Sequence, residues 1–212
     1  MTESSTRTLN LQWNSDTGVG YFPVDQFLDG ENPYDQAYLE TYQSYEGSPI
    51  WAKLNNLRLK LVSDFTKGTV LDVGCGAGHF VELRQKTGMD TFGYDIIPEA
   101  ITSLLERGLW GELETVHALS FWDSLEHIKD WQPVVDLAEE WVFVSIPIFK
   151  DKAGALKSKH YKPREHFHYF THKGLVGAMW DRGLRIRAMT DGESRAGRHG
   201  IRSFAFQRVR NP

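Results

Sequence analysis

The sequence predicts an α/β fold with a doubly wound, mostly parallel sheet of about seven strands, a C-terminal antiparallel hairpin and additional N-terminal helices. Three observations predict this fold. From residue 69 onwards, apolar strand-like runs alternate with amphipathic helical runs. The first strand-like run leads directly into a turn with three glycines. The last two runs are close enough along the chain to pair as a hairpin.

Two segments precede the alternating region. Residues 1–20 are polar, and we interpret them as a weakly ordered lead-in. Residues 34–47 carry four tyrosines on one helical face, a stripe that either packs on the main domain or forms a lid over a ligand. A second helix is expected at about 50–65. We therefore expect an N-terminal extension and possible lid over residues 1–50 and the main domain over residues 51–212.

The remaining elements follow in chain order from the hydrophobic pattern and from glycine and proline at their ends. Strands are expected at 69–75, 91–96, 114–122, 141–149, 184–191 and 203–210, and helices at 77–88, 98–108, 133–140 and 171–183.

Composition and charge limit the function classes. The formal net charge is −4, so no global field attracts nucleic acid or an anionic membrane. The single cysteine, Cys75, cannot form an internal disulfide, which suits a reducing compartment. No signal-peptide pattern opens the sequence and no 18-residue apolar run follows, so we expect a cytoplasmic protein without membrane association.

The glycine-rich turn in VLDVGCGAGHF, residues 70–80, indicates a ligand without phosphate. A triphosphate loop needs a Lys-Ser/Thr pair after its glycines, and none is present here. A dinucleotide loop has its third glycine where His79 stands, whereas Gly78 comes one residue early. Asp72, just before the loop, would repel a pyrophosphate but suits an ammonium group.

A second acid supplies a place for a ribose. Asp95 ends the second strand, 19 residues after Gly76, where a carboxylate accepts hydrogen bonds from both ribose hydroxyls. A ribose, a cationic group and a close backbone approach without phosphate together describe S-adenosylmethionine.

These residues resemble the class I S-adenosylmethionine-dependent methyltransferases, whose first motif is matched by VLDVGCGAG and whose second is matched by GYD. The resemblance covers about residues 50–205 and implies a Rossmann-like domain. LNNLRLKLV looks like the lead-in helix of ubiquinone-biosynthesis-type O-methyltransferases, in which the arginine approaches the methionine carboxylate. This makes Arg58 a candidate, with an exposed surface arginine as the alternative.

The segment SFWDSLEHIKD is similar to the fourth motif of the same superfamily. It implies that Phe121 and Trp122 lie beside the methionine part of the cofactor, with core packing as the alternative. Between residues 108 and 118 the acid or amide that contacts adenine in relatives is missing, so Trp110 and Leu113 would flank the adenine instead. The expected cofactor-binding residues are Arg58, Asp72, Gly74, Cys75, Gly76, Gly78, Asp95, Ile96, Phe121 and Trp122.

Histidines crowd residues 157–174, where EHFHYFT looks like an H-x-x-x-F-[ST] element of relatives. They form a structural cluster, a metal site or a substrate-contacting group. Without a cysteine partner or an H-E-x-x-H motif, we predict no metal. His166 and His168, with His127 from the L-E-H triplet, are the catalytic candidates, and a structural role is the alternative for His127. Tyr21 and the tyrosine stripe would close over the acceptor.

The predicted function is methyl transfer from S-adenosylmethionine (EC 2.1.1.-) to the oxygen or nitrogen of a small-molecule acceptor. Pyrimidine C5 methylation is excluded because Cys75 lies in the cofactor loop. DNA amino methylation is disfavoured because SFWD replaces the expected N-P-P-Y-type element. A nucleic-acid or nucleotide methyltransferase, an aminopropyl-transferring enzyme and a non-catalytic cofactor-binding protein stay open as alternatives. The acceptor, the general base and the oligomeric state are left undetermined.

Overall fold

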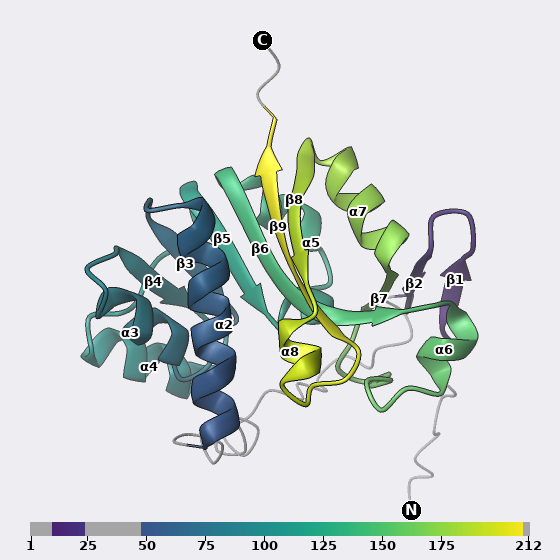
Figure 1. Cartoon of the computed structure of the whole chain (residues 1–212), viewed down its shortest axis with the longest axis horizontal. Helices are drawn as coiled ribbons and strands as arrows, with labels where there is room; N and C mark the ends of the chain where they lie inside the picture. Colours follow the sequence, from purple (N-terminus) through teal and green to yellow (C-terminus); the bar gives the residue numbers. More distant parts are fainter. Residues whose placement is uncertain (1–9, 24–47, 210–212) are drawn as a thin grey trace, which may run out of the picture.

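The computed structural model describes residues 10–23 and 48–209, which form one nine-stranded mixed sheet (Figure 1). The strands pair in the order β1-β2-β7-β6-β5-β3-β4, and β9 pairs with both β6 and β8. Their bounds are β1 Gln12–Asn14, β2 Val19–Tyr21, β3 Val70–Val73, β4 Thr91–Tyr94, β5 Val116–Trp122, β6 Ala138–Phe149, β7 His168–Thr171, β8 Leu184–Thr190 and β9 Ile201–Arg208.

The centre of the sheet is parallel, as the sequence predicts. Strands β3, β4, β5, β6 and β7 pair in parallel, so their C-terminal ends lie at one edge. The apolar, β-branched run of β6 suits a strand that is buried on both faces. The closing hairpin is also confirmed, because β8 and β9 pair antiparallel and β9 pairs antiparallel with β6.

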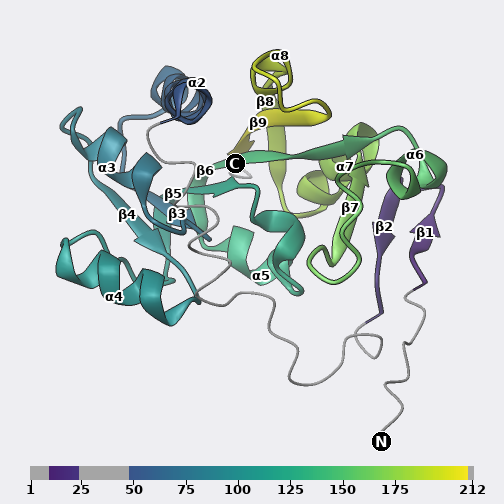
Figure 2. The same cartoon turned by 90° about the horizontal axis from the view of Figure 1, so that it is seen from below.

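Helices cover both faces of the sheet. Side chains of α2 and α3 share one buried cluster with strand residues such as Val70 and Phe143, whereas side chains of α5 and α7 share the other. Figure 2 shows α2 and α5 on opposite sides of the sheet. None of the helices in the described ranges has the length and apolarity needed to cross a bilayer. The helices are α2 Pro49–Phe65, α3 His79–Gln85, α4 Pro98–Glu106, η2 Leu125–His127, α5 Trp131–Asp136, α6 Lys152–Leu156, α7 His172–Asp181 and α8 Gly192–Arg195.

Three features differ from the sequence prediction. Part of the expected lead-in, residues 10–20, forms β1 and most of β2, and β2 extends the sheet by pairing with β7 (Figure 1). Residues 138–140 begin β6 instead of ending a helix, since Ala138 pairs with β5. The short β7, α6 and α8 are additional elements. The tyrosine stripe at 34–47 lies outside the described residues, and the predicted domain boundary at residue 50 stays a prediction.

Candidate active site

A cavity of about 800 Å³, formed by the described residues, opens where β3, β4 and β5 end. This is the edge at which parallel α/β sheets bind ligands. Three groups of residues line it. They are the glycine loop and its flanks (Asp72, Val73, Gly74, Cys75, Gly76, Ala77, His79, Phe80), the segments after β4 and β5 (Tyr94, Asp95, Ile96, Ile97, Trp122, Asp123, Ser124, His127, Ile128, Lys129), and more distant residues (Ile50, Trp51, Leu54, Asn55, Arg58, Leu113, Val134, Arg164, Phe167, Arg198).

The glycine loop needs its glycines for conformation and for space. Gly74 and Gly76 have backbone φ angles of 72° and 54°, which residues with a Cβ rarely adopt. A Cβ on Gly74 would lie 2.6 Å from Cβ of Ser124, so β3 and β5 approach closely there. A Cβ on Gly76 would meet no atom within 4 Å, and Gly76 lines the cavity. The space above Gly76 is therefore available to a ligand.

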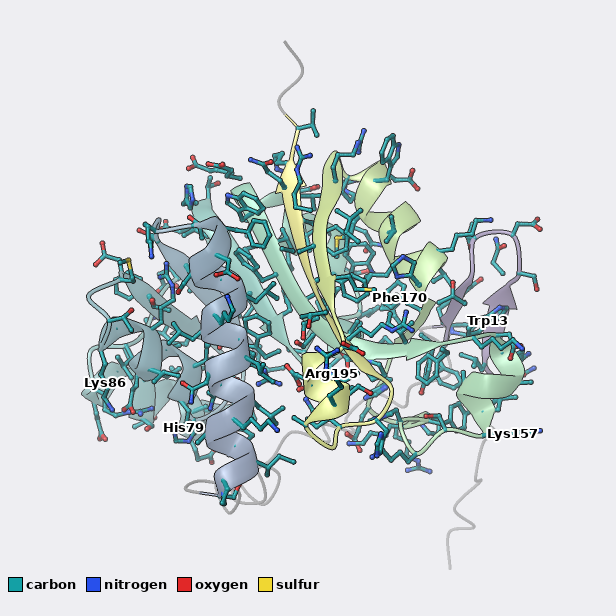
Figure 3. All side chains as sticks on the ribbon, viewed as in Figure 1. Trp13, His79, Lys86, Lys157, Phe170 and Arg195 are labelled. Carbon is teal, nitrogen blue, oxygen red and sulfur yellow. The ribbon has the colours of Figure 1, made fainter. Side chains whose placement is uncertain are left out.

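The helix after the loop packs against the helix before it. His79, the first residue of α3, lies beside α2 (Figure 3), with its ring 5.8 Å from that of Trp51 in an edge-to-face arrangement. Gly78 precedes this helix with a φ of 78°, and a Cβ there would lie 2.8 Å from Leu104 of α4. Gly78 therefore serves helix packing, and it does not line the cavity.

Asp95 connects the second strand to the glycine loop. Its Oδ2 accepts a hydrogen bond from the backbone N–H of Gly76 at 2.8 Å, and its Oδ1 accepts from those of Ile96 and Ile97 at 2.8 and 3.0 Å. A carboxylate has about four acceptor positions, so capacity is left for a ribose hydroxyl. Asp95 thus orders the loop and also faces the cavity at the predicted position.

Asp72 is a buried acid at the floor of the cavity. It is 2% exposed and accepts a hydrogen bond from the Ser120 hydroxyl at 2.6 Å. Burial raises the pKa of Asp72 to about 7, although the Ser120 hydrogen bond and the charge of Arg58 oppose the shift. A cationic ligand group beside Asp72 would favour its ionised form.

Arg58 belongs to a four-residue ion cluster. Its guanidinium donates to Glu193 at 2.8 and 3.2 Å and to Asp123 at 2.8 Å. Arg198 donates to the same two acids, at 2.7 Å to Glu193 and at 2.6 and 2.9 Å to Asp123. Arg58 is buried and lines the cavity, so the surface-arginine alternative does not hold. Burial opposes ionisation of Asp123, but the two arginines lower its pKa to about 2.

The two aromatic candidates at the end of β5, Phe121 and Trp122, lie on opposite faces of the sheet. Trp122 lines the cavity, with the Arg58 guanidinium 5.4 Å from its ring centroid. Its indole Nε1 is buried and has no hydrogen-bond partner among the described residues. Phe121 points to the opposite face, because residues alternate along a strand, and it is fully buried in the cluster with α5 and α7. Core packing is therefore the role that the structure supports for Phe121.

The remaining cofactor candidates lie where the sequence suggests. Ile96 is 62% exposed and lines the cavity next to Asp95. Cys75 lines it too, and burial raises the pKa of its thiol well above the usual value. Of the two residues expected near adenine, Leu113 lines the cavity, whereas Trp110 packs on Tyr94 with ring centroids 5.3 Å apart.

Among the three catalytic candidates, His127 lines the cavity, whereas His166 lies behind it. Their rings are edge to face with centroids 4.5 Å apart. Burial lowers the pKa of His127 to about 4 and that of His166 to about 2. Both imidazoles are therefore neutral at pH 7. Glu126 is buried beside them, and its burial, with the charge of Asp123, raises its pKa to about 8.

The other residues of the histidine-rich segment have structural contacts. His168 is bound through Nε2 to the backbone carbonyl of Lys129 at 2.8 Å and lies outside the cavity lining. His160 Nε2 is 2.7 Å from the carbonyl oxygen of His199. The hydroxyl of Tyr21 donates to Gln12 at 2.9 Å, and Tyr21 does not line the cavity. The structural alternative therefore fits His168 and His160.

Comparison with known families decides which proteins this chain is related to. A family model described as a methyltransferase domain matches residues 42–188, more than half of the chain. The chain belongs to the class I S-adenosylmethionine-dependent methyltransferases. A search of curated protein sequences gives no significant match.

Solved structures share the fold of this methyltransferase at low sequence identity. Magnesium protoporphyrin IX methyltransferase of Synechocystis PCC 6803, with bound S-adenosylhomocysteine, has a TM-score of 0.55 and 15% identity over 85% of this chain and 90% of that chain. An S-adenosylmethionine-dependent methyltransferase of Aquifex aeolicus has a TM-score of 0.58 and 16% identity, over 83% of this chain and 100% of that chain. The third structure is a chain from the complex of the Haloferax volcanii activator Trm112 with its proposed methyltransferase. It has a TM-score of 0.64 and 12% identity, over 83% of this chain and 96% of that chain.

The cavity of this methyltransferase fits S-adenosylmethionine, its cofactor. The open space above Gly76 admits a ligand against the backbone, Asp72 offers a carboxyl group without a paired cation in direct contact among the described residues, and Asp95 retains acceptor capacity. When bound, S-adenosylmethionine supplies an electrophilic methyl group on a sulfonium.

Sequence reasoning missed several polar residues of this methyltransferase site. Arg198, Glu193 and Asp123 complete the ion cluster, and Ser120 and Ser124 hold the strand ends together. Arg198 and Glu193 come from the connection between β8 and β9, which has no motif. Asp123 is the last residue of the SFWD segment. It has a φ angle of 60°, a left-handed conformation that cannot be predicted from the local sequence.

Proposed function

We infer that this methyltransferase transfers the methyl group of S-adenosylmethionine to a hydroxyl or amine of a small-molecule acceptor. One observation carries this proposal. The cavity contains the glycine loop, Asp72 and Asp95, and it continues without a break to His127, Phe167 and Val134. One continuous cavity would thus hold the cofactor beside an acceptor.

The cofactor end follows from the residues that line it. Asp95 would accept hydrogen bonds from the ribose, and Ile96 with Leu113 would contact the adenine. Asp72 would pair with the ammonium group, and Arg58 with Arg198 would approach the methionine carboxylate. The backbone at Gly76 would lie directly beneath the amino-acid part, since no side chain of the described residues covers it.

The acceptor end is mostly apolar and suits a small organic molecule. Ile128, Val134 and Phe167 line it, and the exposed cations Lys129 and Arg164 stand at its rim. An acceptor with an apolar body and an anionic group fits this combination. The likeness to magnesium protoporphyrin IX methyltransferase supports a small-molecule acceptor. The net charge of −4 has the same sign as a phosphate backbone and disfavours nucleic acid.

Methyl transfer requires the donor, the methyl carbon and the nucleophile in line, so the protein acts chiefly by orienting them and excluding water. A hydroxyl or ammonium acceptor must also lose a proton. His127 is the catalytic candidate that lines the cavity, and its neutral ring can accept that proton. His166 would hold it in place from behind, and we assign no direct role to His168.

Methyl-labelled S-adenosylmethionine tests this proposal. The full-length protein is incubated with pools of hydroxyl and amine compounds, half of them carboxylated, and products are separated by mass. We expect S-adenosylhomocysteine and a product heavier by the labelled methyl group, with carboxylated acceptors preferred. Cofactor binding without labelled product from any pool, or transfer of an unlabelled aminopropyl group, would contradict it. A cytoplasmic location stays a prediction.

A further inference from the structure

A buried cluster of three potential ligands lies next to the acceptor end of the cavity. Glu126, His127 and His166 each offer one ligand atom, and these atoms lie within 4.8 Å of one another; no other such group occurs within residues 10–23 and 48–209. Glu126 and His127 come from η2, directly after β5, whereas His166 precedes β7. Residues 39 or more positions apart thus converge on one point.

The backbone holds these segments together. The N–H of Phe167 donates to the carbonyl oxygen of Glu126 at 2.8 Å and joins the two segments. Within the second segment, the N–H of His166 donates to the carbonyl oxygen of Lys162 at 2.8 Å. The two segments are therefore in register before any ligand binds.

Two of the potential ligands contain polar atoms that lack a partner. Glu126 is 2% exposed and His166 is 4% exposed. Oε2 of Glu126 and Nδ1 of His166 have no hydrogen-bond partner among the described residues. Leaving a buried polar atom unpaired costs roughly 1–3 kcal/mol, so two such atoms in one three-residue cluster indicate a missing binding partner.

We propose that Glu126, His127 and His166 bind a divalent transition-metal ion, with Zn²⁺ as the first candidate. Two imidazoles and one carboxylate suit zinc and similar ions, and three protein ligands leave a coordination position open. Ligand atoms around tetrahedral zinc are about 3.4 Å apart. The atoms here, within 4.8 Å of one another, need only a small inward movement.

The position of the ion gives it a use in the reaction. His127 lines the cavity, so an ion bound by this cluster would lie next to the acceptor end. An ion there would bind and polarise an acceptor hydroxyl, and the proton would leave to solvent instead of to His127. This consequence rests on the proposed function, whereas metal binding itself does not.

Calorimetric titration of Zn²⁺ into chelator-treated, tag-free full-length protein tests the site. We expect one ion per chain. Because even an outer-shell partner contributes 10–100-fold to metal affinity, loss of a direct ligand in Glu126→Gln or His166→Gln should weaken binding at least about 100-fold. Titration with Co²⁺ should give the visible absorption of a low-coordinate site, and the variants should lose it. Circular dichroism confirms that each variant is folded.

The matched control is His172→Gln, which removes an exposed histidine outside the cluster. It should bind Zn²⁺ like the wild type. Failure of the wild type to bind one ion, or unchanged affinity in both folded ligand variants, would overturn the site. Methyl transfer by a protein that does not bind zinc would overturn this inference and leave the proposed function intact. Zinc binding without methyl transfer would support the metal site and overturn the proposed function.

Discussion

At the scale of single residues, the two acids of the cofactor end have different environments and different consequences. Asp72 is buried against one hydroxyl, whereas Asp95 accepts three backbone hydrogen bonds. The first acid is poised to change its charge when a cation binds. The second holds the glycine loop in shape and lines the cavity from there.

The raised pKa of Asp72, about 7, makes cofactor binding depend on pH. The ammonium group pairs with the ionised carboxylate, so binding should release a proton and strengthen roughly tenfold between pH 5.5 and 7. The unliganded protein responds in the opposite sense. Because the folded pKa is above the unfolded value, the stabilisation from protonated Asp72 is complete below about pH 4 and is lost as pH rises through 7.

Calorimetry of S-adenosylhomocysteine binding in two buffers of different ionisation enthalpy measures the proton release. Asp72→Asn should remove both the release and the pH dependence between pH 5.5 and 7. A wild-type affinity that is constant over this range would contradict the assigned pairing.

Replacement of Asp95 should weaken the cofactor site and the loop together. Asp95→Ala leaves the N–H groups of Gly76, Ile96 and Ile97 without their acceptor, so we expect losses of roughly 1–3 kcal/mol both in cofactor binding and in the free energy of unfolding. Calorimetry and urea denaturation measure the two. Glu106→Ala, which removes an exposed acid of α4, is the control. Equal behaviour of the two variants would exclude the role of Asp95.

At the scale of elements, the ion cluster joins parts of the chain that are distant in sequence. Arg58 comes from α2, Asp123 follows β5, Glu193 lies in α8 and Arg198 follows it. Ser145 of β6 also donates to Glu193 at 2.8 Å. The cluster therefore fixes the position of α2 over the cavity relative to the sheet.

Arg58→Met should destabilise the protein by about 3 kcal/mol. It removes one cationic partner of the Glu193 carboxylate, which is only 1% exposed. Urea denaturation measures this loss. Arg187→Met removes an exposed arginine of β8 and should change the free energy of unfolding by less than about 0.5 kcal/mol. A loss below 1 kcal/mol in Arg58→Met would show that the cluster is not a structural connection.

The sequence predicted best what depends on neighbouring residues. The strand, glycine turn and helix around Gly74 form one continuous motif, and Asp95 lies at a set distance from it. Both acids that the sequence assigns to the cofactor therefore line the same cavity, and their role stays a prediction. The ion cluster could not be predicted, because its members are separated by up to 140 positions and have no local pattern. Strands β1 and β2 are three residues long. They depend on β1 pairing with β2 and β2 pairing with β7, which the local sequence does not encode.

At the scale of the whole molecule, the parallel strands bring the site together. The ends of β3, β4 and β5 meet at one edge, and the helices on both faces leave that edge open to a cavity of about 800 Å³. A space of this size is at the upper end for small-molecule sites and admits a cofactor and an acceptor together. The fold thus explains how residues as distant in sequence as Arg58 and Arg198 line one cavity.

The central claim is that the glycine loop lies directly beneath the cofactor. Gly76 and Gly88 offer a matched pair: both have positive φ, 54° and 80°, and a Cβ on either would meet no atom within 4 Å. Alanine should therefore strain both backbones similarly, by roughly 1–2 kcal/mol. Gly76 lines the cavity, whereas Gly88 follows α3 outside it.

Calorimetric titration of S-adenosylhomocysteine into the wild type, Gly76→Ala and Gly88→Ala tests this claim most directly. We predict 1:1 binding to the wild type, similar binding to Gly88→Ala, and affinity lowered more than about tenfold in Gly76→Ala, since a methyl group there occupies the space of the ligand. No binding to the wild type, or equal affinities in all three proteins, would contradict the account.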